Sequence, residues 1–283
     1  MSGMAGRALV LGGGGVTGVA WELGIVAGLV EEGIDLTAAD LIVGTSAGSV
    51  VGAIIASGEP VAAAYERQLQ PPPVTDRSAR LGLALILRYV VAAATARDPQ
   101  RVRAKIGALS LRARTIPEQE RRRVIADRLR SADWPTTQRL LVTAVAADDG
   151  EFVIFDRDSS VSLVDAVSAS CAVPGVWPPA TVNGRRYIDG GARSPANVDL
   201  ATECDRVVVL APITAALRRD GRPGRQLAAL PAARGLLIAP DREAARAIGS
   251  NVLDGARRTA AARAGMAQAR TVASAVRSVW SAS

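Results

Sequence analysis

Short apolar runs alternate with longer stretches of helical periodicity over most of the chain. The apolar runs predict buried strands at Arg7–Leu11, Leu41–Val43, Leu140–Ala146, Phe152–Phe155, a segment ending at Tyr187 and Ile188, and Arg206–Leu210. The helical stretches predict helices from about Val19 to Glu32, up to Ser57, at Ser162–Cys171 and from about Asp241 to Trp280. Strands that alternate with helices indicate an α/β fold around a mostly parallel sheet, with the last helix covering that sheet.

Residues 61–139 interrupt this alternation. Leu81–Ala96 is apolar except for Arg88, which makes it too short and too charged to span a membrane. It predicts either a buried helix or a helix that lies in a membrane interface. Arg101–Arg130 predicts two basic helices that meet near Pro117. We therefore expect a single domain over 1–283, with core motifs within 7–211, a helical basic cap at about 61–139 inserted between strands, and a C-terminal helical segment at about 241–283.

The charge of the chain is concentrated in the predicted cap. The net charge is +7, and the stretch from Glu66 to Arg139 alone holds 16 basic and 7 acidic residues, most densely at Arg121–Arg123. A basic segment of this kind indicates either an anionic partner, such as a membrane surface or a nucleic acid, or a solvated arginine-rich surface. The chain as a whole is apolar enough for a large core, with 49% hydrophobic residues and a mean hydropathy of +0.19.

The chain contains no histidine, which excludes a Ser-His-Asp triad and histidine-ligated metal sites. Its two cysteines, Cys171 and Cys204, lie in apolar sequence without the close spacing of a metal or redox motif. We expect both to be reduced core residues of a cytosolic protein. No apolar signal segment precedes the first predicted strand, which also favours a cytoplasmic location.

The clearest candidate for chemistry is Gly44-Thr45-Ser46-Ala47-Gly48, a G-x-S-x-G sequence between a predicted strand and a predicted helix. This context is the one in which the motif forms a sharp turn that exposes a nucleophilic serine. Small neighbours allow the strained turn, and the N-terminus of the following helix points N–H groups towards a developing oxyanion. The alternative interpretation is a tight turn between strand and helix with no catalytic role.

A second glycine-rich loop, Gly12–Gly18, follows the first predicted strand. Its glycines fit a dinucleotide-binding fingerprint, with Glu32 or Asp35 as a ligand for the ribose. They also fit an oxyanion hole, because glycine lets backbone N–H groups approach a tetrahedral oxygen closely. The neighbouring G-x-S-x-G favours the oxyanion hole, since a dinucleotide site does not need an exposed serine there.

Three motifs stand in a characteristic order: Gly13–Gly18, Gly44–Gly48, and Asp189-Gly190-Gly191 at the end of a predicted strand. The stretch Ala169–Pro174, running on to Pro178-Pro179, adds a fourth point of similarity. With these motifs the chain resembles the patatin-like phospholipase family over Arg7–Gly58 and Leu140 to about Leu210. The resemblance implies a three-layer α/β/α fold.

The resemblance also implies a Ser–Asp dyad, with Ser46 as nucleophile and Asp189 as general base. It implies an oxyanion hole formed by the backbone of Gly13, Gly14 and Gly15. The remaining motif residues that it implies are Gly18, Gly44, Gly48, Gly190 and Gly191. It implies no metal and no organic cofactor, and the absence of histidine fits a carboxylate base independently.

The sequence departs from the family at Thr17, where the family's loop often has Lys or Arg; this removes a supplementary charge but leaves the N–H donors. We expect a serine acyl-ester hydrolase of the phospholipase A or lysophospholipase type, with a lipid substrate. Peripheral association with an anionic membrane through the basic cap is a further expectation. The alternative is a non-catalytic α/β protein that binds a nucleotide or a lipid. A nucleic-acid partner is not expected, because the arginines lack interleaved aromatic residues.

Overall fold

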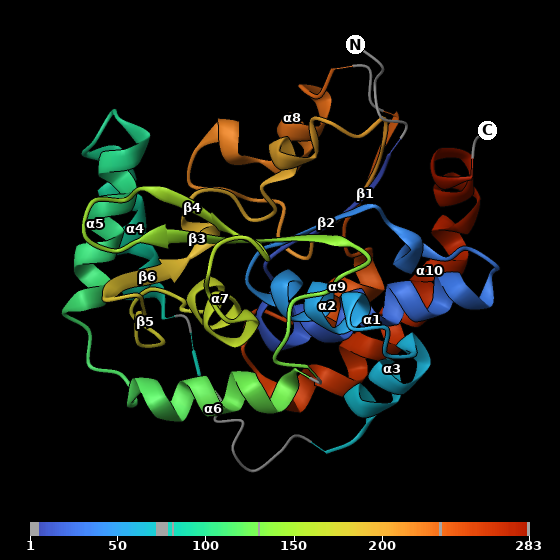
Figure 1. Ribbon diagram of the computed structural model, residues 1–283, viewed down its shortest axis with the longest axis horizontal. Coiled ribbons are helices and arrows are strands. Elements are labelled where there is room, and N and C mark those ends of the chain that lie inside the picture. The colour runs from blue at the N-terminus through green and yellow to red at the C-terminus, as the bar shows by residue number, and fades with distance from the viewer. Residues whose placement is uncertain (1–5, 72–78, 81, 130, 232–233, 282–283) are drawn as a thin grey trace.

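Eight strands form one mixed sheet within residues 6–71, 79–80, 82–129, 131–231 and 234–281, which the computed structural model describes (Figure 1). The strands are β1 (Arg7–Leu11), β2 (Leu41–Gly44), β3 (Arg139–Ala146), β4 (Phe152–Phe155), β5 (Ala180–Val182), β6 (Arg185–Asp189), β7 (Arg206–Leu210) and β8 (Arg234–Ile238). Their order is β5-β6-β3-β2-β1-β7-β8, and β4 pairs with β3 outside this path. Strands β3, β2, β1, β7 and β8 run parallel, whereas β4, β5 and β6 are antiparallel to their neighbours.

Strands β2 and β6 approach the same edge of β3 from opposite ends. Gly44 lies opposite Val142, and Asp189 lies opposite Ala144. β4 pairs with β3 across both of these positions and therefore takes the other edge. The ends of β2 and β6 consequently converge on Thr143, the β3 residue between the two pairs. This meeting point brings the G-x-S-x-G turn next to the Asp-Gly-Gly turn.

Alternating side chains of the strands pack against helical layers on the two faces of the sheet. Leu9 and Leu11 of β1 pack in the core below α1 (Gly15–Glu31), α2 (Ala47–Ala56), α3 (Val61–Leu69), α7 (Leu163–Ser170) and α10 (Arg258–Trp280). Ala8 and Val10 face the opposite side, which is covered by the segment around Val198 and by α8 (Pro223–Ala228). Helices α4 (Leu83–Ala94) and α5 (Pro99–Leu111) cover the β3–β6 part of that second face. The chain thus has the predicted three-layer α/β/α architecture.

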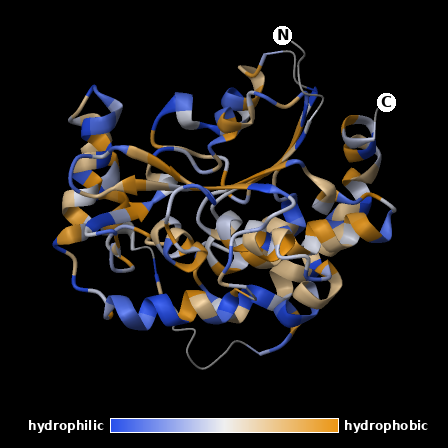
Figure 2. Ribbon diagram, in the orientation of Figure 1, coloured by the Kyte–Doolittle hydropathy of each residue, from blue (hydrophilic) through white to orange (hydrophobic). Residues whose placement is uncertain are grey.

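Helix α6 (Glu118–Arg128) lies at the rim of the molecule, below α7 in Figure 1. Figure 2 shows that much of α6 is hydrophilic, in contrast to the strands that lie above it in this view. Val124 and Ile125 are its buried residues, while Arg122 and Arg123 are exposed. The helix therefore packs one narrow apolar side against the rest of the protein, and its arginine-rich surface faces outwards.

The first and last helices pack against each other with unusually close backbones. A Cβ added at Gly24 of α1 would overlap the Ala262 carbonyl oxygen, and one added at Gly265 of α10 would overlap the Trp21 carbonyl oxygen. The buried Trp21 Nε1 donates a hydrogen bond to Gln268 Oε1 over 2.9 Å. The long C-terminal helix is thereby fixed to the helix that follows the glycine loop.

Several predicted elements need correction. Helix α1 begins at Gly15 rather than at Val19, because the glycines pack its first turn against the Pro212 and Val252 segments instead of forming a loop. The tail is not one helix, since α9 (Arg242–Ile248) ends at Gly249, whose φ of +74° stops it before α10. Strands β5 and β8 were not predicted. Pro72, Pro73, Leu81 and Arg130, which belong to predicted cap segments, lie outside the described residues.

The other predicted elements agree with the structure within a few residues. The two basic helices that meet near Pro117 are α5 and α6. Leu81–Ala96 corresponds to α4, which lies at the surface with Leu87 and Val91 exposed and is therefore not the buried helix of the first alternative. None of the described helices combines the length and the apolar character needed to cross a bilayer. Both cysteines are free and buried, as expected.

Candidate active site

Ser46 occupies the sharp turn between β2 and α2. Its backbone has φ 54° and ψ −116°, a conformation that non-glycine residues adopt only when the surrounding structure enforces it. The turn is enforced by close packing: a Cβ at Gly48 would overlap the Leu11 carbonyl oxygen, and one at Gly44 would lie 2.6 Å from Ser49 Cα. The Ser46 N–H donates to Ser170 Oγ over 2.9 Å. These contacts fix the serine at the top of α2, where 7% of the residue remains exposed.

Asp189 ends β6 and lies beside Ser46. Its Oδ1 accepts the N–H of Gly191 over 2.7 Å, and a Cβ at Gly190 would overlap Thr143 Oγ1, so the turn is pressed against β3. Burial raises the pKa of this carboxyl to about 6, although a hydrogen bond with the Ser46 side chain, the Gly191 amide and the charge of Arg121 hold the pKa down. A carboxylate with this pKa, in contact with a serine hydroxyl, can act as a general base near neutral pH.

The glycine loop borders the same serine. The Gly13 N–H donates to the Pro195 carbonyl oxygen over 2.7 Å, whereas no hydrogen bond among the described residues uses the N–H of Gly14 or Gly15. A Cβ at Gly14 would lie 2.5 Å from Pro212 Cβ, and Gly15 has a φ of +59°, so both positions require glycine. Gly18 lies in the first turn of α1. The start of α1 therefore offers N–H donors and the positive end of a helix dipole.

A cavity of about 1180 Å³ opens above these groups. Ser46, Asp189 and Gly13–Gly15 line its base. Its walls are mainly apolar side chains of α4 and two loops, namely Ile86, Val90, Val173, Pro174, Ile213 and Leu217. The Tyr89 hydroxyl donates to the Pro174 carbonyl oxygen and ties α4 to the cavity wall. A space of this size and polarity suits a long apolar chain that ends in a reactive carbonyl group.

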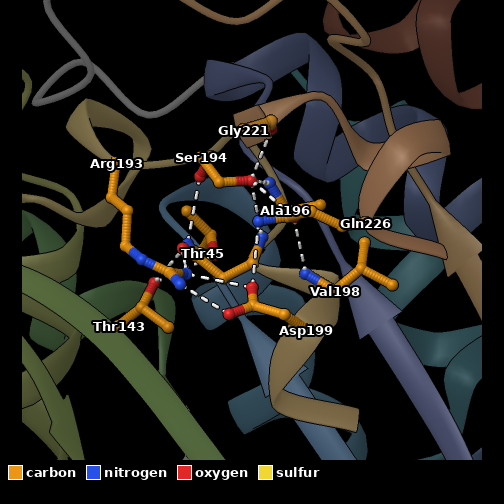
Figure 3. Close-up of polar contacts among 10 residues, drawn as sticks. Thr45, Thr143, Arg193, Ser194, Ala196, Val198, Asp199, Gly221 and Gln226 are labelled. Carbon is orange, nitrogen blue, oxygen red and sulfur yellow. Dashed lines mark hydrogen bonds and ion pairs between the residues drawn. The ribbon is translucent and has the colours of Figure 1, made fainter. Parts of the chain in front are cut away.

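A buried polar network joins the Asp189 loop to the nucleophile turn (Figure 3). Asn197 Nδ2 donates to Thr45 Oγ1 over 3.0 Å and to Thr143 Oγ1 over 3.3 Å, and these two hydroxyls lie 2.9 Å apart. The Asn197 Oδ1 accepts from Arg193, which also binds Asp199. Further hydrogen bonds connect the network to the α8 segment through Ser194, Val198, Gly221 and Gln226. The network thus fixes the position of the Asp189 loop relative to the nucleophile turn.

The structure brings together Ser46, Asp189 and the glycine loop, and it separates other residues that the sequence suggested. Glu32 and Asp35 lie at the far end of α1, which for 17 residues is about 25 Å from the glycine loop. No ribose bound at the loop could reach them. The three cap arginines also diverge, since Arg121 faces the site, Arg122 bonds Asp165 and Arg123 is exposed.

Sequence reasoning missed several groups that shape the site. Thr143 and Asn197 carry no local signal, and Arg121 is marked only as part of the basic run Arg121–Arg123, because the proximity of all three to Ser46 arises only from the fold. Ser170 lies within the Ala169–Pro174 stretch that matched the family pattern. This similarity was the sequence signal that could have placed Ser170 at the site.

Known proteins resemble this chain over about two thirds of its length. The family model for patatin-like phospholipase matches residues 9–202. An uncharacterised NTE family protein of Mycobacterium bovis is 32% identical over 193 residues, which cover 66% of this chain and 43% of that protein. Counterparts in two strains of Mycobacterium tuberculosis match equally well. The chain thus spans less than half the length of these relatives.

A solved structure shares the fold. The crystal structure of VipD from Legionella pneumophila superposes with a TM-score of 0.54 at 14% identity, covering 96% of this chain and 67% of VipD. At this identity the likeness concerns the fold alone.

Proposed function

Because the chain belongs to the patatin-like phospholipase family, we propose that it is a serine hydrolase that cleaves the acyl ester of a lipid. Ser46 is the nucleophile and Asp189 the general base. The observation that carries this proposal is the contact of a serine in a strained turn with a buried carboxyl whose pKa is raised to about 6. Both groups lie at the base of one large apolar cavity.

The acylation step follows from these positions. Ser46 Oγ attacks the ester carbonyl carbon while Asp189 takes the hydroxyl proton. The negative charge of the tetrahedral intermediate falls to the N–H groups of Gly14 and Gly15, because Gly13 donates its own N–H to Pro195. When the intermediate collapses, the ester C–O bond breaks and Asp189 returns the proton to the leaving alcohol.

Deacylation repeats the chemistry with water. Asp189, again ionised, takes a proton from a water molecule that attacks the acyl-Ser46 ester, and the same N–H groups bind the second oxyanion. When this second intermediate collapses, the bond between the acyl carbon and Ser46 Oγ breaks, Asp189 returns the proton to Ser46 Oγ, and the acyl chain leaves through the cavity as a fatty acid. The proposed cycle draws only on groups of the chain and water.

We test this proposal with a fluorophosphonate probe, which labels only activated serines. Wild type should be labelled, whereas Ser46→Ala and Asp189→Asn should not. Ser168→Ala is the matched control, because Ser168 is a buried serine of α7 outside the cavity and should leave labelling intact. Absence of labelling in folded wild type, with and without liposomes, would refute hydrolysis and favour a protein that binds a lipid or nucleotide without cleaving it.

The outer face of α4 suits a lipid surface. Leu87 and Val91 are 60% and 51% exposed, and Ile86 and Val90 on the same helix are exposed while they also line the cavity. The exposed Arg88 adds a positive charge to this face. We assign peripheral contact with an anionic membrane to this part of the predicted cap, since an apolar face flanked by cations favours such a surface. A lipid would then enter the cavity directly from the membrane.

A further inference from the structure

A polar pocket of about 600 Å³ lies beside the large apolar cavity. It is formed by α5, the loop that follows Asp189, and the α8 segment, and its lining does not include Ser46 or Asp189. The two spaces share a wall made of Ala192, Leu217, Arg218, Asp220 and Arg225. A ligand in the polar pocket would therefore contact the loop of the catalytic base without occupying the substrate cavity.

Both aspartates that line the pocket are already paired with arginines. Arg193 donates to both carboxylate oxygens of Asp199, as Figure 3 shows, and its guanidinium lies 4.2 Å from the centre of the Phe152 ring. Arg218 forms an ion pair with Asp220 over 3.4 Å. Each of these arginines is matched by an acid, so the charge of the pocket depends on its other arginines.

Arg103 of α5 is one of these other arginines. It is half-buried, and its Nε donates to a neutral group, the Gly150 carbonyl oxygen, over 2.7 Å. Burial and the charge of Arg193 lower its pKa, whereas Asp98 and Asp149, which do not line the pocket, act in the opposite direction. Arg103 thus brings a second positive charge close to that of Arg193.

Arg225 of α8 also lacks an acid. It is exposed, and among the described residues its side chain has no hydrogen-bond or ion-pair partner. Arg103 and Arg225 therefore give the pocket two positive charges that no lining carboxylate balances. Part of the remaining lining is apolar, with Pro99, Val102 and Leu230.

We propose that this pocket binds a soluble phosphate monoester, with its phosphate held by Arg103 and Arg225 and its organic group against Pro99, Val102 and Leu230. A phosphate monoester carries a charge of about −2 at pH 7, which matches the two unbalanced arginines. Guanidinium groups bind phosphate oxygens through paired, charge-assisted hydrogen bonds.

The size and the surroundings of the pocket support an organic, soluble ligand. A space of about 600 Å³ is typical of sites for organic molecules and is much larger than a bare phosphate needs. Exposed large apolar side chains gather on α4, whereas among the described residues only Leu217 of this kind lines the pocket. A bilayer would therefore find little apolar surface around the pocket, which favours a soluble ligand over a membrane lipid.

The ligand would also act on the catalytic loop. Arg193 belongs to the loop after β6 and donates to Asn197 Oδ1 over 2.7 Å, and Asn197 donates to Thr45, the residue before Ser46. A bound dianion would offset the repulsion between Arg103 and Arg193 and so stabilise the arrangement in which Arg193 supports this network. The phosphate monoester should therefore activate the enzyme, a regulatory role that rests on the proposed hydrolase function.

Calorimetry with phenyl phosphate tests the binding site without turnover. Wild type and Ser46→Ala should bind it equally, because Ser46 does not line the pocket. Arg103→Gln and Arg225→Gln should each bind it about tenfold more weakly, as expected for the loss of a charge-assisted hydrogen bond. Arg225 is exposed, so its variant keeps the test valid even where Arg103→Gln fails to fold. Arg101→Gln and Arg222→Gln, exposed arginines outside the lining, are the matched controls. Equal affinity in all variants would overturn the site.

Three further probes separate the possible ligands. Phenol lacks the phosphate and should not bind, and inorganic phosphate lacks the organic group and should bind more weakly than phenyl phosphate. Equal binding of either probe would overturn the assignment to a phosphate monoester. Phosphatidylcholine vesicles that contain phosphatidate present the same phosphate on a lipid. If these vesicles displace phenyl phosphate while pure phosphatidylcholine vesicles do not, the ligand is a lipid head group and the soluble ligand is refuted.

The rate of fluorophosphonate labelling at Ser46 tests the regulatory role. Phenyl phosphate should raise this rate in wild type by about fivefold or more, as in typical coupling between two sites, and should have a smaller effect on Arg225→Gln at the same concentration. Slower labelling would place the phosphate in the substrate cavity, and an unchanged rate would overturn the regulation. Wild type that binds phenyl phosphate but is never labelled would refute the hydrolase function and retain the binding site.

Discussion

The Asn197 amide donates a hydrogen bond to the Thr45 hydroxyl, which lies 3.0 Å away and directly precedes Ser46 in the chain. Asn197 itself stands on the loop that follows Asp189 and adopts a left-handed conformation with φ 52°. The bond therefore fastens the loop of the base to the turn of the nucleophile. Thr143 of β3 accepts a hydrogen bond from the same amide over 3.3 Å. The amide therefore also binds the strand on which both segments converge.

Removal of this amide should loosen the site. We expect Asn197→Ala to lower the free energy of unfolding by about 2–3 kcal/mol, because it leaves two buried hydroxyls with fewer partners and forces alanine into a left-handed conformation. The rate of fluorophosphonate labelling should fall as well. Denaturant unfolding and labelling kinetics measure the two effects.

Asn183 provides the matched control for this variant. It has a φ of 49° in the turn between β5 and β6 and is exposed, so Asn183→Ala carries the backbone cost without the network. A loss of stability as large in Asn183→Ala as in Asn197→Ala would contradict a special role for the network.

The raised pKa of Asp189 predicts the pH dependence of the reaction. The base must be ionised, so kcat/KM should rise about tenfold per pH unit below about pH 6 and level off above it. Arg121 lowers the pKa of this carboxyl, and Arg121→Gln should therefore move the midpoint to higher pH. A neutral monomeric ester, assayed over about pH 4.5–8, reports both effects. A profile that stays flat from about pH 5 to 7 would contradict Asp189 as the base.

The sequence predicted the parts of the site that depend on local chemistry. Ser46 and Gly48 belong to a strand–turn–helix unit whose small residues indicate the turn by themselves. Gly14 and Gly15 belong to a glycine-rich loop directly after a buried strand, and this position predicts N–H donors at the sheet edge. Asp189 follows from the order of the family motifs rather than from its own neighbours, since Asp-Gly-Gly alone is typical of an ordinary turn.

The remaining features depend on contacts between distant segments. Arg121 and Arg123 are indistinguishable in a run of three arginines, and only the packing of α6 turns the first of them towards Ser46. Strand β8 was missed because its short run Leu236–Ile238 resembles many loops until it pairs with β7. The start of α1 was misjudged because glycines usually weaken a helix, whereas here contacts with Pro212 and Val252 stabilise its first turn.

Glu22 is a buried acid that the proposed reaction does not use. It lies on α1 with no exposed surface, and among the described residues neither carboxyl oxygen has a hydrogen-bond partner. Burial raises its pKa well above the usual value, and the nearby Gly12 amide, whose N–H is donated to Leu210, offsets this only in part. The folded protein therefore binds the Glu22 proton more tightly than the unfolded chain does.

The contribution of Glu22 to the stability of the protein should accordingly fall as the pH rises. Glu22 contributes full stability below its unfolded pKa of about 4.3, and this contribution is lost as the pH rises towards the raised folded pKa. Glu22→Gln is neutral at every pH and should raise Tm at neutral pH while it changes Tm little at about pH 4. Thermal unfolding of both proteins across this range measures the difference. A variant that is less stable than wild type at neutral pH would show that the Glu22 carboxylate has a favourable partner.

The outer face of α4 predicts binding to vesicles. Replacing Leu87 and Val91 by serine removes two side chains that are 60% and 51% exposed and free to enter a lipid interface. Each should contribute about 1 kcal/mol or more, so the double variant should bind anionic vesicles roughly tenfold more weakly or worse. Vesicle co-sedimentation at low and high salt measures the affinity, and circular dichroism verifies the fold. Val30→Ser is the matched control, because Val30 is 47% exposed at the far end of α1 and should not touch the membrane. Equal binding by wild type and the double variant would assign any membrane contact to another surface.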